Sequence, residues 1–230
     1  MTPRIILLPG LDGTGLAYRA LQSHLSPLDS SVTPLATQSA GYAADLNVAL
    51  QRIPKSGPYV LVAESYSGPI GISIAATHPP GLVGLVLSTT FLSCPRPYLG
   101  QLRLLLKVLP PIRVPAAPFV PLLLNGRSTP ETRQLLRMVL QSASPKAMLA
   151  RLNDVATVNV AAAANAIQVP TLYLKASADR VVPSAAGDAI RRHIPQATIT
   201  ELAGPHLLLQ ACAQAAAKKI TEFNTCAGVS

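Results

Sequence analysis

Short apolar runs alternate along the chain with longer segments whose apolar residues recur at helical spacing. The runs are near-continuous, a pattern typical of parallel strands that are buried on both faces of a sheet. On this basis six strands are predicted, at residues 4–8, 32–35, 59–62, 82–88, 171–175 and 198–202. Helices are predicted between and after them, at residues 16–25, 42–52, 68–78, 184–193 and 207–223. This order predicts a doubly wound α/β fold whose mostly parallel sheet binds ligands at the carboxyl ends of its strands.

Residues 94–165 interrupt the alternation, because they contain no convincing strand. Their pattern is helical at 98–109, 131–142 and 145–155, and prolines separate these stretches. A connection this long between two core strands exceeds the usual crossover length. We therefore predict a core formed by residues 1–93 and 166–230, with a helical cap inserted at 94–165.

The stretch Ala63–Ser67 places Ser65 at a sharp turn between the third predicted strand and the helix that follows it. Small residues stand two positions to either side, as the close approach of strand and helix requires. The turn would aim the backbone N–H of Tyr66 at the space above the serine, where an oxyanion could sit. The alternative is a buried strand that ends in a serine N-cap, since serine is a favoured cap residue.

Two more polar groups follow the last two predicted strands, namely Asp179 and His206. Because the carboxyl ends of parallel strands lie at one edge of a sheet, Ser65 could meet both. An imidazole that accepts the serine proton makes the hydroxyl nucleophilic, and a carboxylate fixes the tautomer of that imidazole. We interpret Ser65 as a nucleophile, His206 as its base and Asp179 as the acid.

The loop Leu8–Gly15 follows the first predicted strand and is rich in glycine. Its backbone can turn N–H groups toward the serine, so the N–H of Leu11 is predicted to complete an oxyanion hole with that of Tyr66. The rival interpretation is a phosphate-binding loop. The stretch lacks both the G-K-[ST] ending and the G-x-G-x-x-G spacing of such loops.

Together these motifs resemble the α/β-hydrolase superfamily, in particular its small bacterial esterase-like members. The resemblance extends along nearly the whole chain and rests on the Leu8–Gly15 loop, the turn Ala63–Pro69, the stretch Asp179–Pro183 and the stretch Gly204–Gln210. It implies a Ser65 nucleophile, a His206 base, an Asp179 acid, an acyl-enzyme intermediate and no cofactor or metal. It also implies a core that lacks the first two strands of the family. The chain departs from the pattern at Ala63 and Ser67, where glycine is usual, and at Pro9, where histidine is commoner.

Other polar residues could in principle take these roles. Ser67 is a second hydroxyl on the turn. A nucleophile at this position would need small residues at positions 65 and 69, and position 69 is a proline. The remaining histidines fall in or at the end of predicted helices and are interpreted as surface or capping groups: His24, His78 and His193. Asp154 is the reserve for the acid role, whereas Asp188 is expected to face solvent. Asp12 and Glu64 flank the site and are interpreted as loop-bonding or packing groups that at most tune a pKa.

Composition narrows the function classes. Aromatic residues make up only 4% of the chain, which argues against stacking on single-stranded nucleic acid. The net charge of +9 is concentrated between residues 94 and 151, which hold nine basic residues and only one acidic residue. These basic residues are interpreted either as a solvated face or as a surface that attracts an anionic partner. That partner would be a carboxylated or phosphorylated substrate, an acidic acyl-carrier protein or an anionic membrane surface. The predicted helices of this region are interrupted by prolines and carry no motif that reads a DNA groove, so specific DNA binding is not expected.

We expect a carboxylesterase-type serine hydrolase that acts on a small ester with a short-to-medium acyl chain. An acyltransferase or a thioester-directed esterase on the same three residues is the alternative, and a non-catalytic binding protein with this fold is a third class. The three cysteines are widely spaced and are expected to be free thiols, and no segment reaches the length of a membrane-spanning helix. These features favour a soluble cytoplasmic protein.

Overall fold

The computed structural model describes residues 2–36, 41–96, 98, 112–113 and 115–228. Six strands form a single sheet in the order β2-β1-β3-β4-β5-β6, and every pair of neighbours is parallel. The strands are β1 (Arg4–Leu8), β2 (Ser30–Val32), β3 (Tyr59–Glu64), β4 (Leu82–Ser88), β5 (Thr171–Ala176) and β6 (Ala197–Leu202). The predicted α/β fold with a parallel sheet of about six strands is therefore confirmed.

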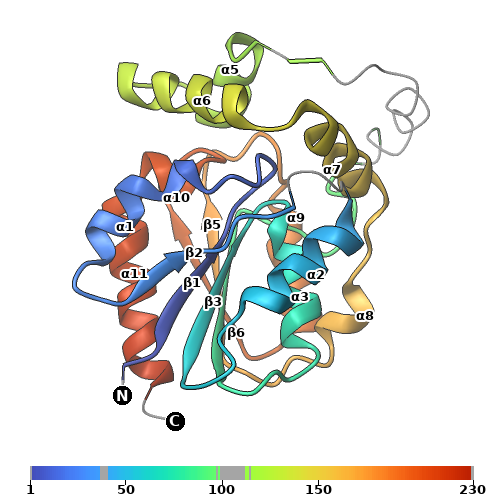
Figure 1. The fold of residues 1–230 in the computed structure, drawn as a ribbon, viewed down its shortest axis with the longest axis vertical. Helices are drawn as coiled ribbons and strands as arrows, with labels where there is room; N and C mark the ends of the chain where they lie inside the picture. Colours follow the sequence, from blue (N-terminus) through green and yellow to red (C-terminus); the bar gives the residue numbers. More distant parts are fainter. Residues whose placement is uncertain (1, 37–40, 97, 99–111, 114, 229–230) are drawn as a thin grey trace.

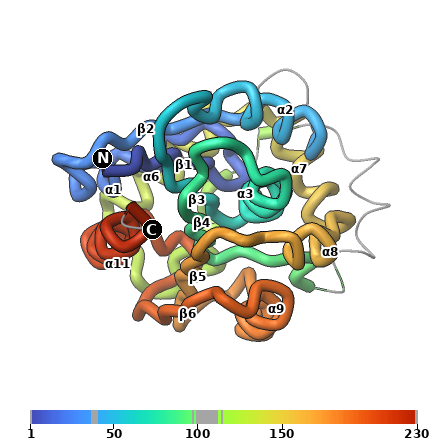
Figure 2. Tube along the Cα trace, turned by 90° about the horizontal axis from the view of Figure 1, so that it is seen from below, coloured from blue at the N-terminus to red at the C-terminus, as the bar shows by residue number. Residues whose placement is uncertain are grey.

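Helices cover both faces of this sheet (Figures 1 and 2). One face packs against α1 (Arg19–Leu25) and α11 (Ala213–Ala227), and α10 (Leu208–Ala211) leads into the latter. The other face packs against α2 (Tyr42–Arg52), α3 (Ser67–Ala75), α8 (Ala161–Ala164) and α9 (Ala185–His193). Along β1, Ile5 and Leu7 face the first layer while Ile6 and Leu8 face the second. Burial on both faces explains why the strands are unbroken apolar runs.

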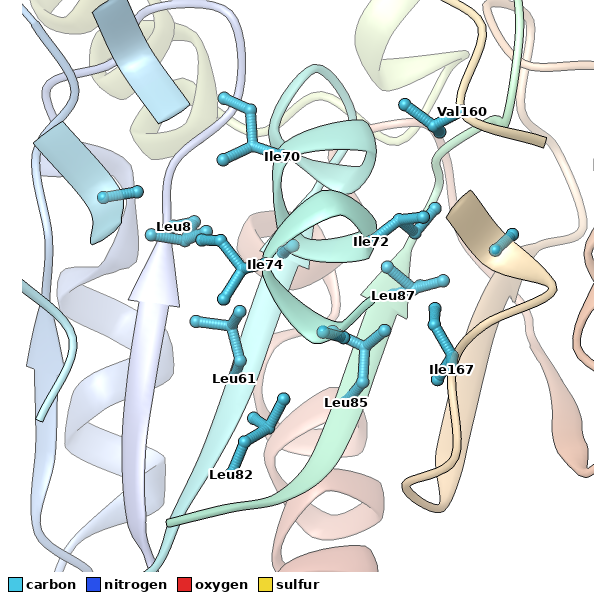
Figure 3. Packing of buried hydrophobic residues seen from close by; sticks show 14 of the residues in the cluster. Leu8, Leu61, Ile70, Ile72, Ile74, Leu82, Leu85, Leu87, Val160 and Ile167 are labelled. Carbon is cyan, nitrogen blue, oxygen red and sulfur yellow. The ribbon is translucent and has the colours of Figure 1, made fainter. Parts of the chain in front are cut away.

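Helix α3 is the most deeply buried of the helices beside the sheet. Its isoleucines Ile70, Ile72 and Ile74 are fully buried, and Figure 3 shows them among leucines of β1, β3 and β4. Each such side chain contributes roughly 1.5–3 kcal/mol relative to leaving it exposed. Two glycines permit this close packing. A Cβ at Gly71 would lie 2.8 Å from the Cβ of Ala63, and one at Gly68 would lie 1.8 Å from Thr90 Oγ1.

Several predicted boundaries are wrong. The helix predicted at 68–78 ends at Ala75. The second strand spans Ser30–Val32, so it shares only Val32 with the predicted range 32–35. It ends there because Pro34 has no N–H to donate, and the N–H of Leu35 donates instead to Gly13 O in the neighbouring loop. The predicted helix 207–223 is two helices, with a break at Cys212, whose backbone (φ −126°) is not helical. The second of these helices continues to Ala227.

Three helices of the predicted cap lie beyond the carboxyl ends of the strands (Figure 1). They are α5 (Val120–Leu124), α6 (Pro130–Ser142) and α7 (Pro145–Thr157), and they are called the α5–α7 segment below. Thr129 caps α6 through the N–H of Thr132, and Ser144 caps α7 through the N–H of Ala147. Residues 99–109 of the helix predicted at 98–109 lie outside the described residues, and the division into core and cap stays a prediction. Of the helices that the structure describes, not one has both the length and the apolar character needed to cross a bilayer.

Candidate active site

Ser65 occupies a strained turn at the end of β3. Its φ of 51° is in the left-handed region, which costs a residue with a Cβ roughly 1–2 kcal/mol. The turn is held from β4, because Ser65 N–H donates to Ser88 O at 2.9 Å and Thr90 Oγ1 donates to Ser65 O at 2.6 Å. This backbone directs the Ser65 side chain out of the sheet edge, between β3 and the start of α3.

The loops that carry Asp179 and His206 are brought together by the pairing of β5 with β6. Beyond the two strands, Ser177 N–H donates to Leu202 O and Ala178 N–H donates to Gly204 O, both at 3.0 Å. The ladder therefore continues into both loops and fixes their relative register. A Cβ at Gly204 would lie 2.5 Å from Leu208 Cδ1, so only glycine lets the second loop pack this closely.

The three side chains form one hydrogen-bonded chain. Ser65 Oγ lies 3.0 Å from His206 Nε2, and His206 Nδ1 lies 2.9 and 3.0 Å from the two carboxylate oxygens of Asp179. His206 is 3% exposed, and the carboxylate of Asp179 is also almost fully buried. With the ring protonated on Nδ1, the imidazole donates to Asp179 and leaves Nε2 to accept the Ser65 proton.

The carboxylate of Asp179 is itself oriented by the backbone. Its Oδ1 atom accepts the N–H of Val181 at 2.8 Å and that of Val182 at 2.9 Å. These two bonds lock the carboxylate rotamer, which places Oδ2 at 2.9 Å and Oδ1 at 3.0 Å from His206 Nδ1. The orientation of the imidazole is thus determined by a loop of the main chain as well as by a charge.

The Leu8–Gly15 loop lies against the serine. A Cβ built on Gly10 would stand 3.8 Å from Ser65 Cβ, and both Gly13 and Gly15 have positive φ. In the described part of the chain, neither the Leu11 N–H nor the Tyr66 N–H donates a hydrogen bond. Tyr66 also precedes the first residue of α3, where the positive end of the helix dipole lies. Both N–H groups are therefore available to a negatively charged oxygen.

The rival residues lie elsewhere. Ser67 is fully buried, and its Oγ bridges Leu8 O at 2.8 Å and Glu64 O at 3.0 Å. This hydroxyl ties the ends of β1 and β3 together, which explains serine where the family usually has glycine. Asp154 contacts the Tyr66 hydroxyl at 3.3 Å and does not hydrogen-bond to His206. The remaining candidates are exposed or half-buried outside the site: His24, His78, His193 and Asp188.

Glu64, next to the serine, is buried behind the site. Its Oε2 atom accepts the Gln210 side-chain N–H at 2.9 Å, while its Oε1 atom has no partner among the described residues. Burial raises the pKa of this carboxyl to about 7, against the opposing hydrogen bond from Gln210. Glu64 is therefore a packing group that is largely protonated below neutral pH. The Asp12 side chain instead accepts from Thr14 within its own loop, at 2.8 Å from the backbone N–H.

A Glu64→Gln substitution is expected to stabilise the protein at pH 8 but not at pH 5. The folded-state pKa is raised from 4.5 to about 7, so the folded protein binds more protons than the unfolded chain between these values. Stability contributed by Glu64 is therefore present at low pH and is lost as pH rises through 7. Glutamine is neutral at both pH values, so the variant does not lose this free energy of unfolding, which amounts to at most about 3 kcal/mol. Denaturant unfolding of both proteins at pH 5 and pH 8 measures the difference, and an equal difference at the two pH values would contradict the assignment.

Sequence reasoning missed a buried ion pair beside the site. Arg151 on α7 was counted among the cap cations, yet it is 1% exposed and its Nε lies 2.8 Å from Asp45 Oδ2 on α2. The signal was the position of Arg151 on the buried face of α7, together with Ala147 and Met148. Asp45 offered no comparable signal, because an acid in the first turn of a helix usually faces solvent.

A cavity of about 310 Å³ lies beside the acid, between the end of β5 and the start of α9. Its lining includes Arg96, Lys175 and Asp179, whereas Ser65 and His206 do not contribute to it. The cavity therefore adjoins the site without containing the nucleophile. In the parts of the chain that the structure describes, no three His, Cys, Asp or Glu side chains are grouped as metal ligands would be.

The geometry agrees with the results of sequence-family comparison. The family model described as Hydrolase_4, serine aminopeptidase S33, matches residues 36–205. The chain belongs to this α/β-hydrolase family. The matched range contains Ser65 and Asp179 and ends one residue before His206. A search of curated protein sequences found no significant match.

Several solved structures share the fold at low sequence identity. The enol-lactonase from Burkholderia xenovorans LB400 superimposes with a TM-score of 0.84 at 18% identity, over 98% of this chain and 92% of its own. A thermophilic esterase from Thermogutta terrifontis gives 0.83 at 21% identity, over 98% and 90%. A bromoperoxidase from Bacillus anthracis gives 0.77 at 15% identity, over 97% and 92%. These likenesses establish the fold, and membership of the family makes the protein a hydrolase.

Proposed function

We propose that this family member is a serine hydrolase that cleaves carboxylic esters through an acyl-enzyme. The observation that carries the proposal is the unbroken hydrogen-bonded chain from Ser65 Oγ through His206 to the Asp179 carboxylate. A buried imidazole between a hydroxyl and an oriented carboxylate is the arrangement that activates a serine. The presence of an esterase and a lactonase among proteins of the same fold supports ester rather than amide cleavage.

In the first half of the reaction, Ser65 Oγ attacks the carbonyl carbon while its proton passes to His206 Nε2. The imidazolium is stabilised by Asp179, and the carbonyl oxygen, now negative, accepts the N–H groups of Leu11 and Tyr66. Collapse of the tetrahedral intermediate breaks the bond to the alcohol, which leaves with the proton from His206. In the second half, His206 deprotonates a water molecule that attacks the acyl-enzyme. Collapse of the second intermediate returns a proton to Ser65 and releases the acid.

The experiment that tests this proposal combines an ester panel with covalent trapping. p-Nitrophenyl esters of graded acyl length should be hydrolysed, with the highest kcat/KM for short-to-medium chains, whereas matched p-nitroanilides should react far more slowly. A fluorophosphonate probe should add one label per chain, and peptide mass mapping should place it on Ser65. Absence of labelling would favour a non-catalytic binding protein. Ester product formed with an added alcohol, at the expense of free acid, would assign acyl transfer instead.

A small ester that carries negative charge is the second candidate substrate, including one held on an acidic carrier protein. Exposed cations of the α5–α7 segment favour it, namely Arg133, Arg137 and Lys146. Arg151 does not belong to this surface, because Asp45 neutralises it in the interior. If these cations attract the substrate, kcat/KM for an anionic ester should fall with rising salt while that for a neutral ester of equal length stays constant. Equal salt dependence for the two esters would exclude this candidate.

A further inference from the structure

Arg151 uses every donor it has. Its Nε and Nη2 atoms bind the two carboxylate oxygens of Asp45 at 2.8 and 3.0 Å, and Nη2 also donates to Ala36 O at 2.7 Å. Its Nη1 atom donates to Leu11 O at 3.2 Å and to Asp12 O at 3.1 Å. A guanidinium has five N–H groups, and these five contacts occupy all of them. Arg151 therefore has no donor left for a substrate anion.

Two of these contacts reach the loop that supplies a proposed oxyanion donor. The carbonyls of Leu11 and Asp12 converge on one nitrogen, which restrains the backbone on the carboxyl side of the Leu11 N–H. The loop lies directly on the guanidinium, since a Cβ at Gly13 would stand 2.2 Å from Nη1. A positive φ of 69° at the same glycine completes the turn.

The second proposed donor residue is anchored to the same ion pair. The Tyr66 hydroxyl donates to Asp45 Oδ2 at 2.9 Å, and the Tyr66 ring centroid lies 5.8 Å from Arg151 Cζ. Burial and the negative charge of Asp45 raise the pKa of the Tyr66 hydroxyl, so it remains a donor. Asp45 also accepts the Ala36 N–H at 2.9 Å, which leaves it fully hydrogen-bonded. Both donor residues thus connect to one buried pair, Leu11 through its carbonyl and Tyr66 through its side chain.

We infer that the Arg151–Asp45 pair, formed between α7 and α2, positions the two backbone donors of the oxyanion hole. The inference rests on the proposed function, since it assigns Leu11 and Tyr66 to the developing oxyanion. A buried ion pair adds little net stability over an apolar pair of equal size, but it holds its acceptors in a defined geometry. Donors must lie within hydrogen-bond distance of the oxyanion, and a misplacement of about 1 Å can cost about 100-fold in rate. Arg151 and Asp45 are positioning residues, since neither has a donor or acceptor directed at the substrate.

The test measures kcat per active site. Active sites are counted by fluorophosphonate titration, so that misfolded protein is not included in the enzyme concentration. Arg151→Lys keeps the charge, but a single ammonium cannot reach Asp45 and both carbonyls. Its kcat should fall about 10- to 100-fold with KM changed less than threefold. Affinity for a trifluoromethyl ketone analogue of the substrate, which forms a tetrahedral oxyanion on Ser65, should fall by a similar factor. Arg191→Met removes an exposed cation from α9, outside the α5–α7 segment, and should leave all three quantities at wild-type values.

Tyr66→Phe provides a second variant that removes one hydroxyl and keeps the ring, so it should fold even if Arg151→Lys does not. Its kcat per site should fall about tenfold, again without a matching change in KM. Whichever of the two variants fold can be compared with wild type. If they have a lower melting temperature but a kcat per site within twofold of wild type, the ion pair is purely structural and the inference is overturned. A change confined to KM would overturn it as well, since it would indicate substrate contact. Failure of the proposed function is distinct, because then Ser65→Ala would itself retain activity.

Discussion

Replacing Ser65 with alanine should lower kcat for p-nitrophenyl butyrate by about 10⁵- to 10⁶-fold, as loss of a serine nucleophile does in other hydrolases. The substitution removes the atom that bonds to the acyl carbon, so no acyl-enzyme can form. Residual turnover would come from binding and from the oxyanion donors alone. The backbone of the turn should persist, because Ser65 N–H donates to Ser88 O and Ser65 O accepts from Thr90 Oγ1, and neither bond involves the Ser65 side chain. Steady-state kinetics on purified protein, together with a melting curve, measure both expectations.

Ser67→Ala is the matched control, since it makes the same change two residues away on the same turn. Its buried hydroxyl bonds to Leu8 O and Glu64 O, so its loss should lower the free energy of unfolding by about 1–3 kcal/mol. Its kcat should remain within about tenfold of wild type, because Ser67 has no contact with His206. A folded Ser65→Ala protein that retains more than a few per cent of wild-type activity would remove Ser65 as the nucleophile. Loss of activity in Ser67→Ala alone would transfer the role to Ser67.

Asp179→Asn should lower kcat at neutral pH by about 10⁴-fold with little change in fold. The N–H groups of Val181 and Val182 both point at Oδ1, so the asparagine must keep its carbonyl oxygen there. Its amide nitrogen then faces His206 Nδ1 in the place of Oδ2 and donates to it. The closer of the two contacts to His206 Nδ1, at 2.9 Å, thus becomes a donor, which favours the tautomer that carries its proton on Nε2 and cannot take the proton of Ser65.

Two further asparagine variants separate this effect from a general loss of charge. Asp188→Asn on the exposed face of α9 should have wild-type kcat. Asp154→Asn should lose far less than Asp179→Asn, because Asp154 contacts the Tyr66 hydroxyl rather than the imidazole. Kinetics of the three variants at one pH decide between the acids. The assignment of Asp179 would fail if Asp154→Asn were the nearly inactive variant and Asp179→Asn remained active.

The sequence was sufficient for features that depend on neighbours along the chain. Runs such as Tyr59–Val62 are apolar throughout because both faces of the sheet are covered, so their strand character can be inferred locally. The expectation that Ser65, Asp179 and His206 lie near one another came from their positions after parallel strands, whose carboxyl ends share one edge. The structure brings the three side chains within hydrogen-bond distance, and their catalytic roles await the substitutions above.

Other features were decided only by tertiary structure, because they depend on contacts between residues far apart in the sequence. Arg151 is an ordinary helical cation until α7 places it over Asp45 and the Leu11 carbonyl, which precede it by 106 and 140 residues. The raised pKa of Glu64 arises from burial, which exists only in the assembled fold. Local patterns record which residues avoid water, but not which polar groups meet inside, since that depends on how strands and helices assemble in three dimensions.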